Sequence, residues 1–135
     1  MSIAFIATKL VVRDVETAEL FYLALGFKVV TRNVGGEAEV HQQQSWMSET
    51  GDRSSHILIL SRFLDLPPPP APAYPGEIWL AVTVPDVDGA LRTVEMAGGR
   101  IVRPGVNRPE HDVRAAIAAD PEGHLIEIVG PMSGG

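Results

Sequence analysis

An internal repeat limits the folds that this chain can adopt. The segment KLVVRDVETAELFYLALGFKVV, which begins at Lys9, aligns without a gap with AVTVPDVDGALRTVEMAGGRIV, which begins at Ala81, an offset of 72 residues. Asp14 therefore matches Asp86, and each follows a β-branched run by one residue. Because two copies occupy most of the 135 residues, the repeat predicts two paired modules and excludes a solenoid of many short turns.

The two copies share the signals of a strand followed by a helix. Residues 5–12 and 78–84 predict strands, and the carboxylates of Asp14 and Asp86 can then accept hydrogen bonds from the first N–H groups of a helix. Gly26 and Gly98 stand where a helix would end in a left-handed residue. Apolar residues recur at helical spacing and predict one buried stripe on each helix. The stripes are Val15, Ala18, Phe21, Tyr22 and Leu25 in the first copy, and Val87, Ala90, Leu91, Val94 and Ala97 in the second.

Three further strands are predicted in each copy, so each half has the order βαβββ. The predicted strands are residues 27–31, 37–47 and 56–61 in the first copy and 100–102, 113–119 and 124–129 in the second. Asp120 to Gly123 fit the residue preferences of a tight turn. Residues 32–55 and 104–112 are the least readable and are expected to contain long loops.

A proline-rich segment separates the two modules. Residues 66–76 hold six of the eleven prolines, which favours a semi-rigid, extended connector. Such a segment can also dock in an aromatic groove, but its place at the repeat boundary favours a linker. We therefore expect a single domain, 1–135, made of module one (1–65), the linker (66–76) and module two (77–135).

Charge and cysteine content narrow the class of protein further. Lys and Arg number 11 and Asp and Glu number 17, a formal net charge of −6 without a basic cluster, so we expect neither nucleic acid nor an anionic membrane as a partner. The absence of cysteine excludes disulfides, thiol nucleophiles and cysteine-ligated metals. No apolar run reaches the ~20 residues of a membrane span. These features indicate a cytoplasmic protein without a signal or an anchor.

Several motifs, taken in order, resemble those of a known superfamily. The helix that begins after Asp14 contains FY and closes in LGF, and the last strand is entered through DPEGHLIEI from Asp120. On a repeated βαβββ pattern, this combination resembles the vicinal oxygen chelate superfamily of glyoxalases, bleomycin-resistance proteins and extradiol dioxygenases. The resemblance covers almost the whole chain. It implies an α+β fold in which two βαβββ modules form a cupped mixed sheet with helices outside, a small-molecule site inside the cup, and a homodimer.

The metal site of such proteins can be compared with this sequence position by position. The resemblance implies four ligands, one from each first strand and one from each fourth strand, with His, Glu or Gln as donors. Alanine and isoleucine have no donor atom and an indole N–H only donates, so we expect no divalent metal here. The histidines show no HxxxH or HExxH spacing that would replace the site. The four corresponding positions are Ala7, Ile59, Trp79 and Glu127.

Strand alternation predicts what faces the cup instead of a metal. The expected surface is an apolar bowl in which Lys9 and Glu127 are the ionisable side chains. These two residues could bind a ligand or form a structural pair that fills the former metal space. Trp79 could stack on a planar ligand or serve as a core aromatic, and Trp46 could line the rim. The predicted ligand-binding residues are Ala7, Lys9, Trp46, Ile59, Trp79 and Glu127.

Three functions remain open at this point. The first is a metal-free binding protein of the bleomycin-resistance type, which holds a small, partly planar molecule. The second is an enzyme of the same fold that uses Glu127 as a catalytic acid or base, with Lys9 setting its ionisation. The third is a metal-dependent lyase, isomerase or dioxygenase. The net charge of −6 suits neutral or cationic ligands better than anionic ones.

Overall fold

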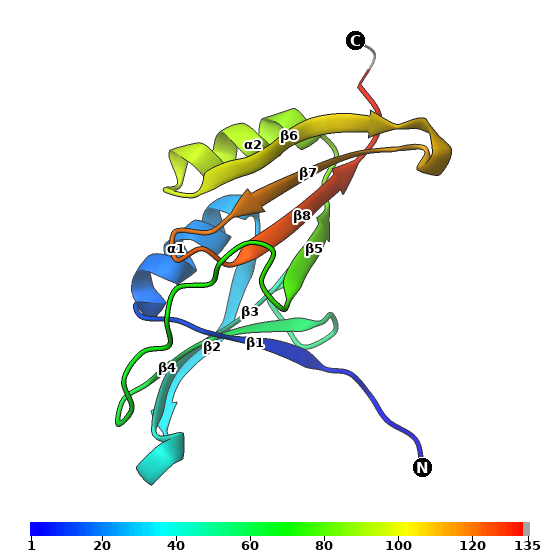
Figure 1. Cartoon of the computed structure of the whole chain (residues 1–135). Helices are drawn as coiled ribbons and strands as arrows, with labels where there is room; N and C mark the ends of the chain where they lie inside the picture. The colour runs from blue at the N-terminus through cyan, green and yellow to red at the C-terminus, as the bar shows by residue number, and fades with distance from the viewer. Residues whose placement is uncertain (134–135) are drawn as a thin grey trace. The chain divides into compact units, whose positions relative to one another are not determined.

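A computed structural model describes residues 1–133, which fall into two compact units, Met1–Pro70 and a second unit that begins at Ala71 (Figure 1). Each unit contains one helix and one four-stranded mixed sheet. The architecture is α+β with two βαβββ repeats, which confirms the predicted fold class. No helix in the described residues is both long and apolar enough to cross a membrane.

The two sheets have the same strand order. In unit 1 the first strand pairs in parallel with the fourth and the other pairs are antiparallel, which gives the order β1-β4-β3-β2. Unit 2 repeats this arrangement as β5-β8-β7-β6. The elements of unit 1 are β1 (Ala7–Val11), α1 (Val15–Leu25), β2 (Lys28–Gly35), a short 3-10 helix (Ala38–Val40), β3 (Gln42–Ser48) and β4 (Ile57–Phe63). Those of unit 2 are β5 (Trp79–Thr83), α2 (Val87–Met96), β6 (Arg100–Arg108), a second 3-10 helix (Pro109–His111), β7 (Val113–Ala119) and β8 (Leu125–Gly130).

Both helices begin at the predicted aspartates. The Asp14 side chain accepts a hydrogen bond from the Thr17 N–H at 3.1 Å, and the Asp86 side chain accepts from the Gly89 N–H at 3.1 Å. At the other ends, Gly26 (φ 110°) follows α1 and a left-handed Gly98 (φ 95°) follows α2. Because an L side chain is strained in this region, the sequence required glycine at both ends.

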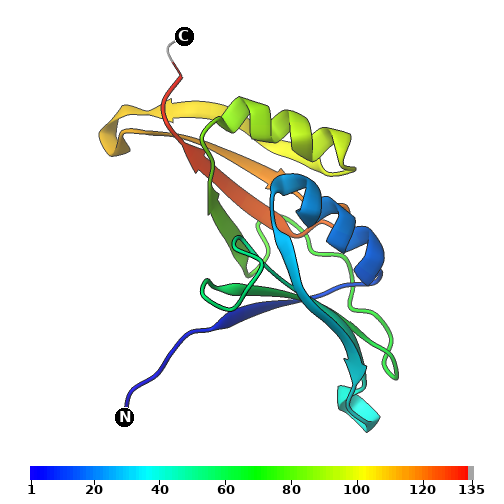
Figure 2. The ribbon, with the colours of Figure 1, turned by 180° about the vertical axis from the view of Figure 1, so that it is seen from behind.

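Each helix packs on one side of its sheet, which we call the helix face, and the opposite side is the far face. In unit 1 the buried Ser45 of β3 donates to Glu19 of α1 at 2.5 Å, which places Ser45 and its cross-strand partner Leu60 on the helix face. In unit 2, α2 lies along β6 and β7 (Figures 1 and 2), and its Asp88 binds Arg114 of β7. Alternation along the strands then assigns every other residue to the far face.

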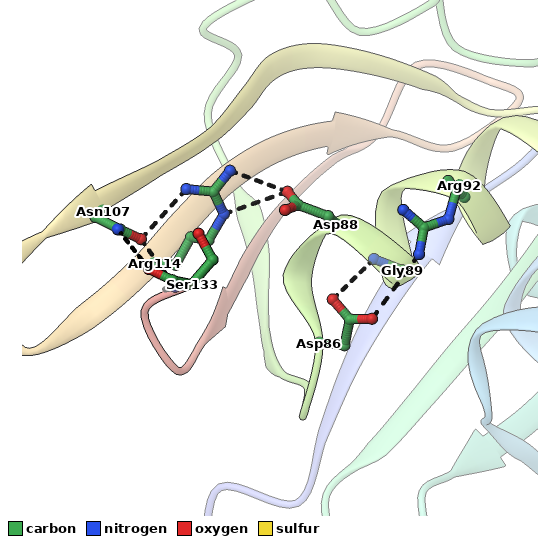
Figure 3. A network of polar contacts seen from close by, with 7 residues as sticks. All are labelled: Asp86, Asp88, Gly89, Arg92, Asn107, Arg114 and Ser133. Carbon is green, nitrogen blue, oxygen red and sulfur yellow. Dashed lines mark hydrogen bonds and ion pairs between the residues drawn. The ribbon is translucent and has the colours of Figure 1, made fainter. Parts of the chain in front are cut away.

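An ion pair clamps each helix to its sheet. In unit 1, Arg32 of β2 donates to both carboxylate oxygens of Glu19, at 2.7 Å and 2.9 Å. In unit 2, the Arg114 guanidinium donates to one Asp88 oxygen at 3.1 Å and 3.2 Å, and to Asn107 Oδ1 at 3.2 Å (Figure 3). The Asn107 side chain also exchanges two hydrogen bonds with the backbone of Ser133 (Figure 3).

The structure corrects three of the predicted boundaries. The third strand, expected over residues 37–47, begins only at Gln42, because the left-handed Gly36 (φ 83°) and Ala38 (φ 52°) turn the chain into a 3-10 helix. The second strand of each copy is also longer than expected, since β2 reaches Gly35 and β6 reaches Arg108. Most of the predicted 104–112 loop is therefore strand. Pro104 fits there because β6 is an edge strand and its register shifts between Arg103 and Val106.

Candidate functional site

The far face of unit 1 brings three of the predicted site residues into one row. Ile59 of β4 pairs with Lys9 of β1 on one side and with Trp46 of β3 on the other. Ile59 is buried, Trp46 is half-buried and Lys9 is exposed. Ala7 is one alternation before Lys9 on the same face. In this row, the apolar side chain of Ile59 therefore lies between the residues that carry an ammonium group, Lys9, and an indole ring, Trp46.

A hydrogen-bonded network on β3 adds polar groups that the sequence analysis missed. Gln42 Oε1 accepts from Lys9 Nζ at 2.6 Å, from Ser61 Oγ at 2.7 Å and from Gln44 Nε2 at 2.9 Å. Gln44 Oε1 in turn accepts from the Trp46 indole N–H at 2.9 Å. Residues 42, 44 and 46 alternate onto one face, and this alternation is the signal in the sequence that could have identified the network. The amides thus orient both Lys9 and Trp46.

The loop between β3 and β4 places a second cation on this face. The Arg53 guanidinium lies 5.1 Å from the centre of the Trp46 ring. Next to it, Asp52 accepts hydrogen bonds from Thr50 Oγ1 and from the Ser54 N–H, both at 2.8 Å, and from Ser54 Oγ at 2.5 Å. These bonds, first among them the one from the Ser54 side chain, lower the pKa of Asp52 to about 2. The loop that carries Arg53 is therefore held by a carboxylate that stays ionised at any physiological pH.

The far face of unit 2 carries Glu127 among apolar neighbours. Glu127 of β8 pairs with Ala81 of β5 and with Ile117 of β7, and neither neighbour has a polar side-chain atom. The Glu127 side chain is half-buried, and within the described residues of unit 2 it makes no hydrogen bond or ion pair. Its carboxylate oxygens therefore remain available to a ligand in this unit. Leu125 and Val129 extend the same apolar face along β8.

Trp79 is held by the chain segment that precedes it. Its indole N–H donates to the Pro75 carbonyl at 2.6 Å, and its ring centre lies 5.9 Å from that of Tyr74 at an interplanar angle of 39°. Trp79 remains half-buried. The indole N–H is the only hydrogen-bond donor of the Trp79 side chain, and the Pro75 carbonyl already accepts from it. A ligand would therefore contact Trp79 through the ring alone.

Three of the histidines interact within their own units. His124 Nδ1 lies 2.9 Å from the buried Asp120 carboxylate, in the predicted turn that the Gly123 N–H closes onto the Asp120 carbonyl. His56 Nε2 lies 2.9 Å from Thr8 Oγ1, and His41 lies 3.4 Å from Asp65. None of these histidines forms, with Glu127 and other described residues, a group that could coordinate a metal ion.

The side chains at the four expected ligand positions do not fit a divalent cation. Ala7 and Ile59 offer hydrocarbon, and the Trp79 N–H cannot coordinate. Gln42, an amide on the same face of unit 1, already accepts three hydrogen bonds through its oxygen. Within residues 1–133, no group of three or more His, Asp or Glu side chains could hold a metal ion. Glu127 alone supplies ligand oxygens, which is too few for a divalent site.

The pairing of Lys9 with Glu127 stays a prediction, because the two residues belong to different units. Within unit 1, the Lys9 ammonium contacts Gln42 and lies 5.8 Å from the centre of the Phe63 ring. The structure thus groups Lys9, Ile59 and Trp46 on one sheet, and Trp79 and Glu127 on the other.

Comparisons with known proteins give a family match and a set of similar folds. A family model described as Glyoxalase/Bleomycin resistance protein/Dioxygenase superfamily matches residues 2–128. A search of curated protein sequences found no match.

Among solved structures, a glyoxalase I mutant from Zea mays superposes with a TM-score of 0.74 at 19% identity, covering 93% of this chain and 46% of that chain. The trypanothione-dependent glyoxalase I of Leishmania major gives a TM-score of 0.71 at 20% identity, covering 96% of this chain and 87% of that chain. A glyoxalase-related enzyme from Fulvimarina pelagi gives 0.63 at 23% identity, covering 96% of this chain and 91% of that chain. At these identities the likeness concerns the fold.

Proposed function

The chain belongs to the glyoxalase/bleomycin resistance protein/dioxygenase superfamily, and from this premise we propose that it binds a small, partly planar organic molecule without the help of a divalent metal. The ligand is held by shape, by ring contacts and by hydrogen bonds, with Glu127 as the principal acceptor in unit 2. The homodimer that the family resemblance implies is part of this proposal, and light scattering measures it.

One observation carries the proposal. Of the four positions where the resemblance implies metal ligands, only Glu127 bears a suitable donor, and its cross-strand neighbours Ala81 and Ile117 are hydrocarbon. A carboxylate whose adjacent cross-strand neighbours are hydrocarbon gains most from a ligand that donates a hydrogen bond or carries positive charge. The net charge of −6 also favours the approach of neutral and cationic molecules.

The first experiment combines metal analysis with ligand screening on one sample. Protein purified without chelator is examined for Ni, Fe, Mn and Zn, and then screened by thermal shift against antibiotics and small metabolites, since a ligand that binds only the folded state raises the melting temperature. We expect less than stoichiometric metal and at least one stabilising compound. Stoichiometric metal would contradict the proposal.

The second experiment tests the part played by Glu127. In Glu127→Gln the shape of the side chain is kept and its charge is lost, so affinity for a cationic ligand should fall about tenfold or more, while affinity for a neutral one should change little. Glu95→Gln, on the exposed side of α2, removes the same charge elsewhere in the unit and serves as the control. Isothermal titration with a ligand found in the screen measures both variants.

The free carboxylate also favours a second candidate, an enzyme in which Glu127 acts as an acid or base. Such a role requires a carboxylate that no structural partner occupies, which is the state of Glu127 within unit 2. If the screened ligand is converted to a product, Glu127→Gln should lower turnover by about 10²–10⁴. A binding protein would show no turnover to lose.

A further inference from the structure

The cations on the far face of unit 1 are held by neutral groups. Lys9 Nζ donates to the Gln42 amide oxygen at 2.6 Å and lies 5.8 Å from the centre of the Phe63 ring. Arg53 lies over the Trp46 ring, and neither cation forms an ion pair with a described residue of the unit. By contrast, Arg32 on the helix face is bound by both oxygens of Glu19. Lys9 and Arg53 are thus oriented without being neutralised.

No carboxylate of the sheet shares this face with them. The residues that β1, β3 and β4 place on the far face are Ala7, Lys9, Val11, Gln42, Gln44, Trp46, Ile57, Ile59, Ser61 and Phe63. Of the acidic residues in the connecting segments, Asp52 is bound by Thr50 and Ser54, and Asp65 pairs with His41. Glu37, Glu39 and Glu49 form no ion pair with either cation. The far face of unit 1 therefore carries positive charge although the whole chain has a net charge of −6.

From this arrangement we propose that Lys9 and Arg53 bind the anionic group, a carboxylate or a phosphate, of the molecule that the protein takes up. The inference rests on the proposed function and specifies the chemical class of the ligand, and it departs from the preference for neutral or cationic molecules that the net charge of −6 suggests, because the charge on this face is positive. Of the three N–H donors of an ammonium, Gln42 uses one. The N–H donors of Arg53 make no hydrogen bond within the described residues of the unit. Charge-assisted bonds to an anion would be about twice as strong as bonds between neutral groups.

The apolar side chains near Lys9 and Arg53 indicate which apolar part the ligand should have. Lys9 and Trp46 flank Ile59 on neighbouring strands, each about 4.8 Å away in a sheet. The Ile59 side chain is only 8% exposed, so the accessible apolar groups beside the cations are the half-buried rings of Phe63, next to Lys9, and Trp46, next to Arg53. An aromatic organic acid fits this arrangement, with its ring against one of these side chains and its anionic oxygens toward the neighbouring cation.

The test uses three small probes that share a phenyl ring. Benzoate carries a carboxylate, phenyl phosphate carries a phosphate, and benzamide is neutral and similar in shape to benzoate. Each is titrated into the full chain at low salt while the indole N–H resonance of Trp46 is followed by NMR. We expect a saturable shift with at least one of the two anions, at least fivefold weaker binding of benzamide, and weaker anion binding when the salt is raised.

Matched substitutions separate a local site from a general charge effect. Lys9→Gln and Arg53→Gln should each weaken binding of the anionic probe about tenfold. Arg62→Gln removes a cation from β4, where the side chain belongs to the helix face by alternation, and should leave the affinity within twofold. Circular dichroism confirms that all three variants are folded.

The outcomes distinguish this inference from the proposed function. Failure of both anions to bind the wild type, or equal losses in all three variants, would overturn the anion site. If neutral or cationic compounds still stabilise a metal-free protein in the screen, the proposed function stands without it. Preference for benzoate over phenyl phosphate would assign the site to carboxylates, and the reverse preference to phosphates.

Discussion

Units 1 and 2 share one strand order and differ in the chemistry of their far faces. Unit 1 carries a linked set of amides with two cations, Lys9 and Arg53. At the same place in the sheet, unit 2 carries one carboxylate, Glu127, between Ala81 and Ile117. Because successive residues of a strand point to opposite faces, the helix faces can keep the core pattern while the far faces diverge. The repeat therefore accounts for the shared fold, and in the proposed function it is the far faces that recognise the ligand.

The helix faces also differ, in the size of the side chains that fill them. Unit 1 buries Phe21, Tyr22 and Met47 almost completely, whereas β7 of unit 2 contributes the small residues Ala116 and Ala118. Large aromatic side chains bury more apolar area per residue. We therefore expect single truncations in unit 1 to cost more stability than those in unit 2.

The largest expected effect is that of Phe21→Ala. Phe21 is 1% exposed and packs edge-on against Tyr22, with ring centres 5.0 Å apart. Removing the ring should lower the free energy of unfolding by about 3–5 kcal/mol, because the transfer energy is lost and a cavity remains. Urea denaturation followed by circular dichroism measures the change.

The matched change in unit 2 is Val94→Ala. Val94 is fully buried on α2, but its side chain is much smaller, so the loss should be about 2 kcal/mol. If Val94→Ala lowered the free energy of unfolding as much as Phe21→Ala or more, the larger core side chains of unit 1 would not make truncations there more costly.

The two helix clamps offer the next comparison. The Glu19 side chain is 11% exposed and Asp88 is 44% exposed. Glu19→Gln removes a charge that Arg32 and Ser45 bind in a mostly buried place, so we expect a loss of about 1–3 kcal/mol in the free energy of unfolding. Asp88→Asn acts at a more solvated pair and should cost less than about 1 kcal/mol.

The Glu19 clamp should also depend on pH. The hydrogen bonds from Arg32, followed by those from Ser45, outweigh burial and lower the pKa of Glu19 below its usual 4.5. A lowered folded-state pKa gives stability that is present above the unfolded-state pKa and is lost as the pH falls through the folded-state value. The difference between wild type and Glu19→Gln should therefore be constant near pH 7 and shrink below about pH 4.5. A difference that stays unchanged down to pH 2 would show that the charge is not its source.

Much of the fold could be predicted because local signals agreed with the repeat. The aspartate caps, the glycine helix ends and the strand 113–119 were predicted and are confirmed. The predicted helical stripes are buried except at Leu25, Ala90 and Ala97, which are half-buried. The strand ends were less predictable, because they depend on pairing with distant residues. β6 continues past Pro104 only because a register shift on an edge strand leaves that position free of a ladder hydrogen bond.

For the candidate site, the sequence predicted which residues share a face of a strand, but not which side chains meet across strands and loops. Alternation identified the far-face positions Lys9, Ile59 and Glu127, since it depends on the strand alone. The network around Gln42 depends on side chains from three strands, and Arg53 reaches Trp46 through the fold of a loop. Pairings of this kind have no periodic signal in the sequence.

The smallest expected effect concerns the helix caps, which the repeat makes a matched pair. Asp14 accepts from both the N–H and the hydroxyl of Thr17, at 3.1 Å and 2.9 Å, whereas at the equivalent place Asp86 meets the N–H of Gly89, which has no side chain to donate. Asp14→Ala should therefore cost about 1–2 kcal/mol in the free energy of unfolding and Asp86→Ala about 1 kcal/mol.

Asparagine keeps the cap acceptor, so Asp14→Asn should lose much less stability than Asp14→Ala. When Thr17→Ala is also present, the hydroxyl bond is already absent, so Asp14→Ala should lose about as much stability as Asp86→Ala. These comparisons are made by urea denaturation at pH 7. If the two alanine variants lose the same stability while Thr17 is present, the hydroxyl bond contributes nothing measurable. The two caps would then be energetically equivalent, and the difference between the units would lie in their cores, their clamps and their far faces.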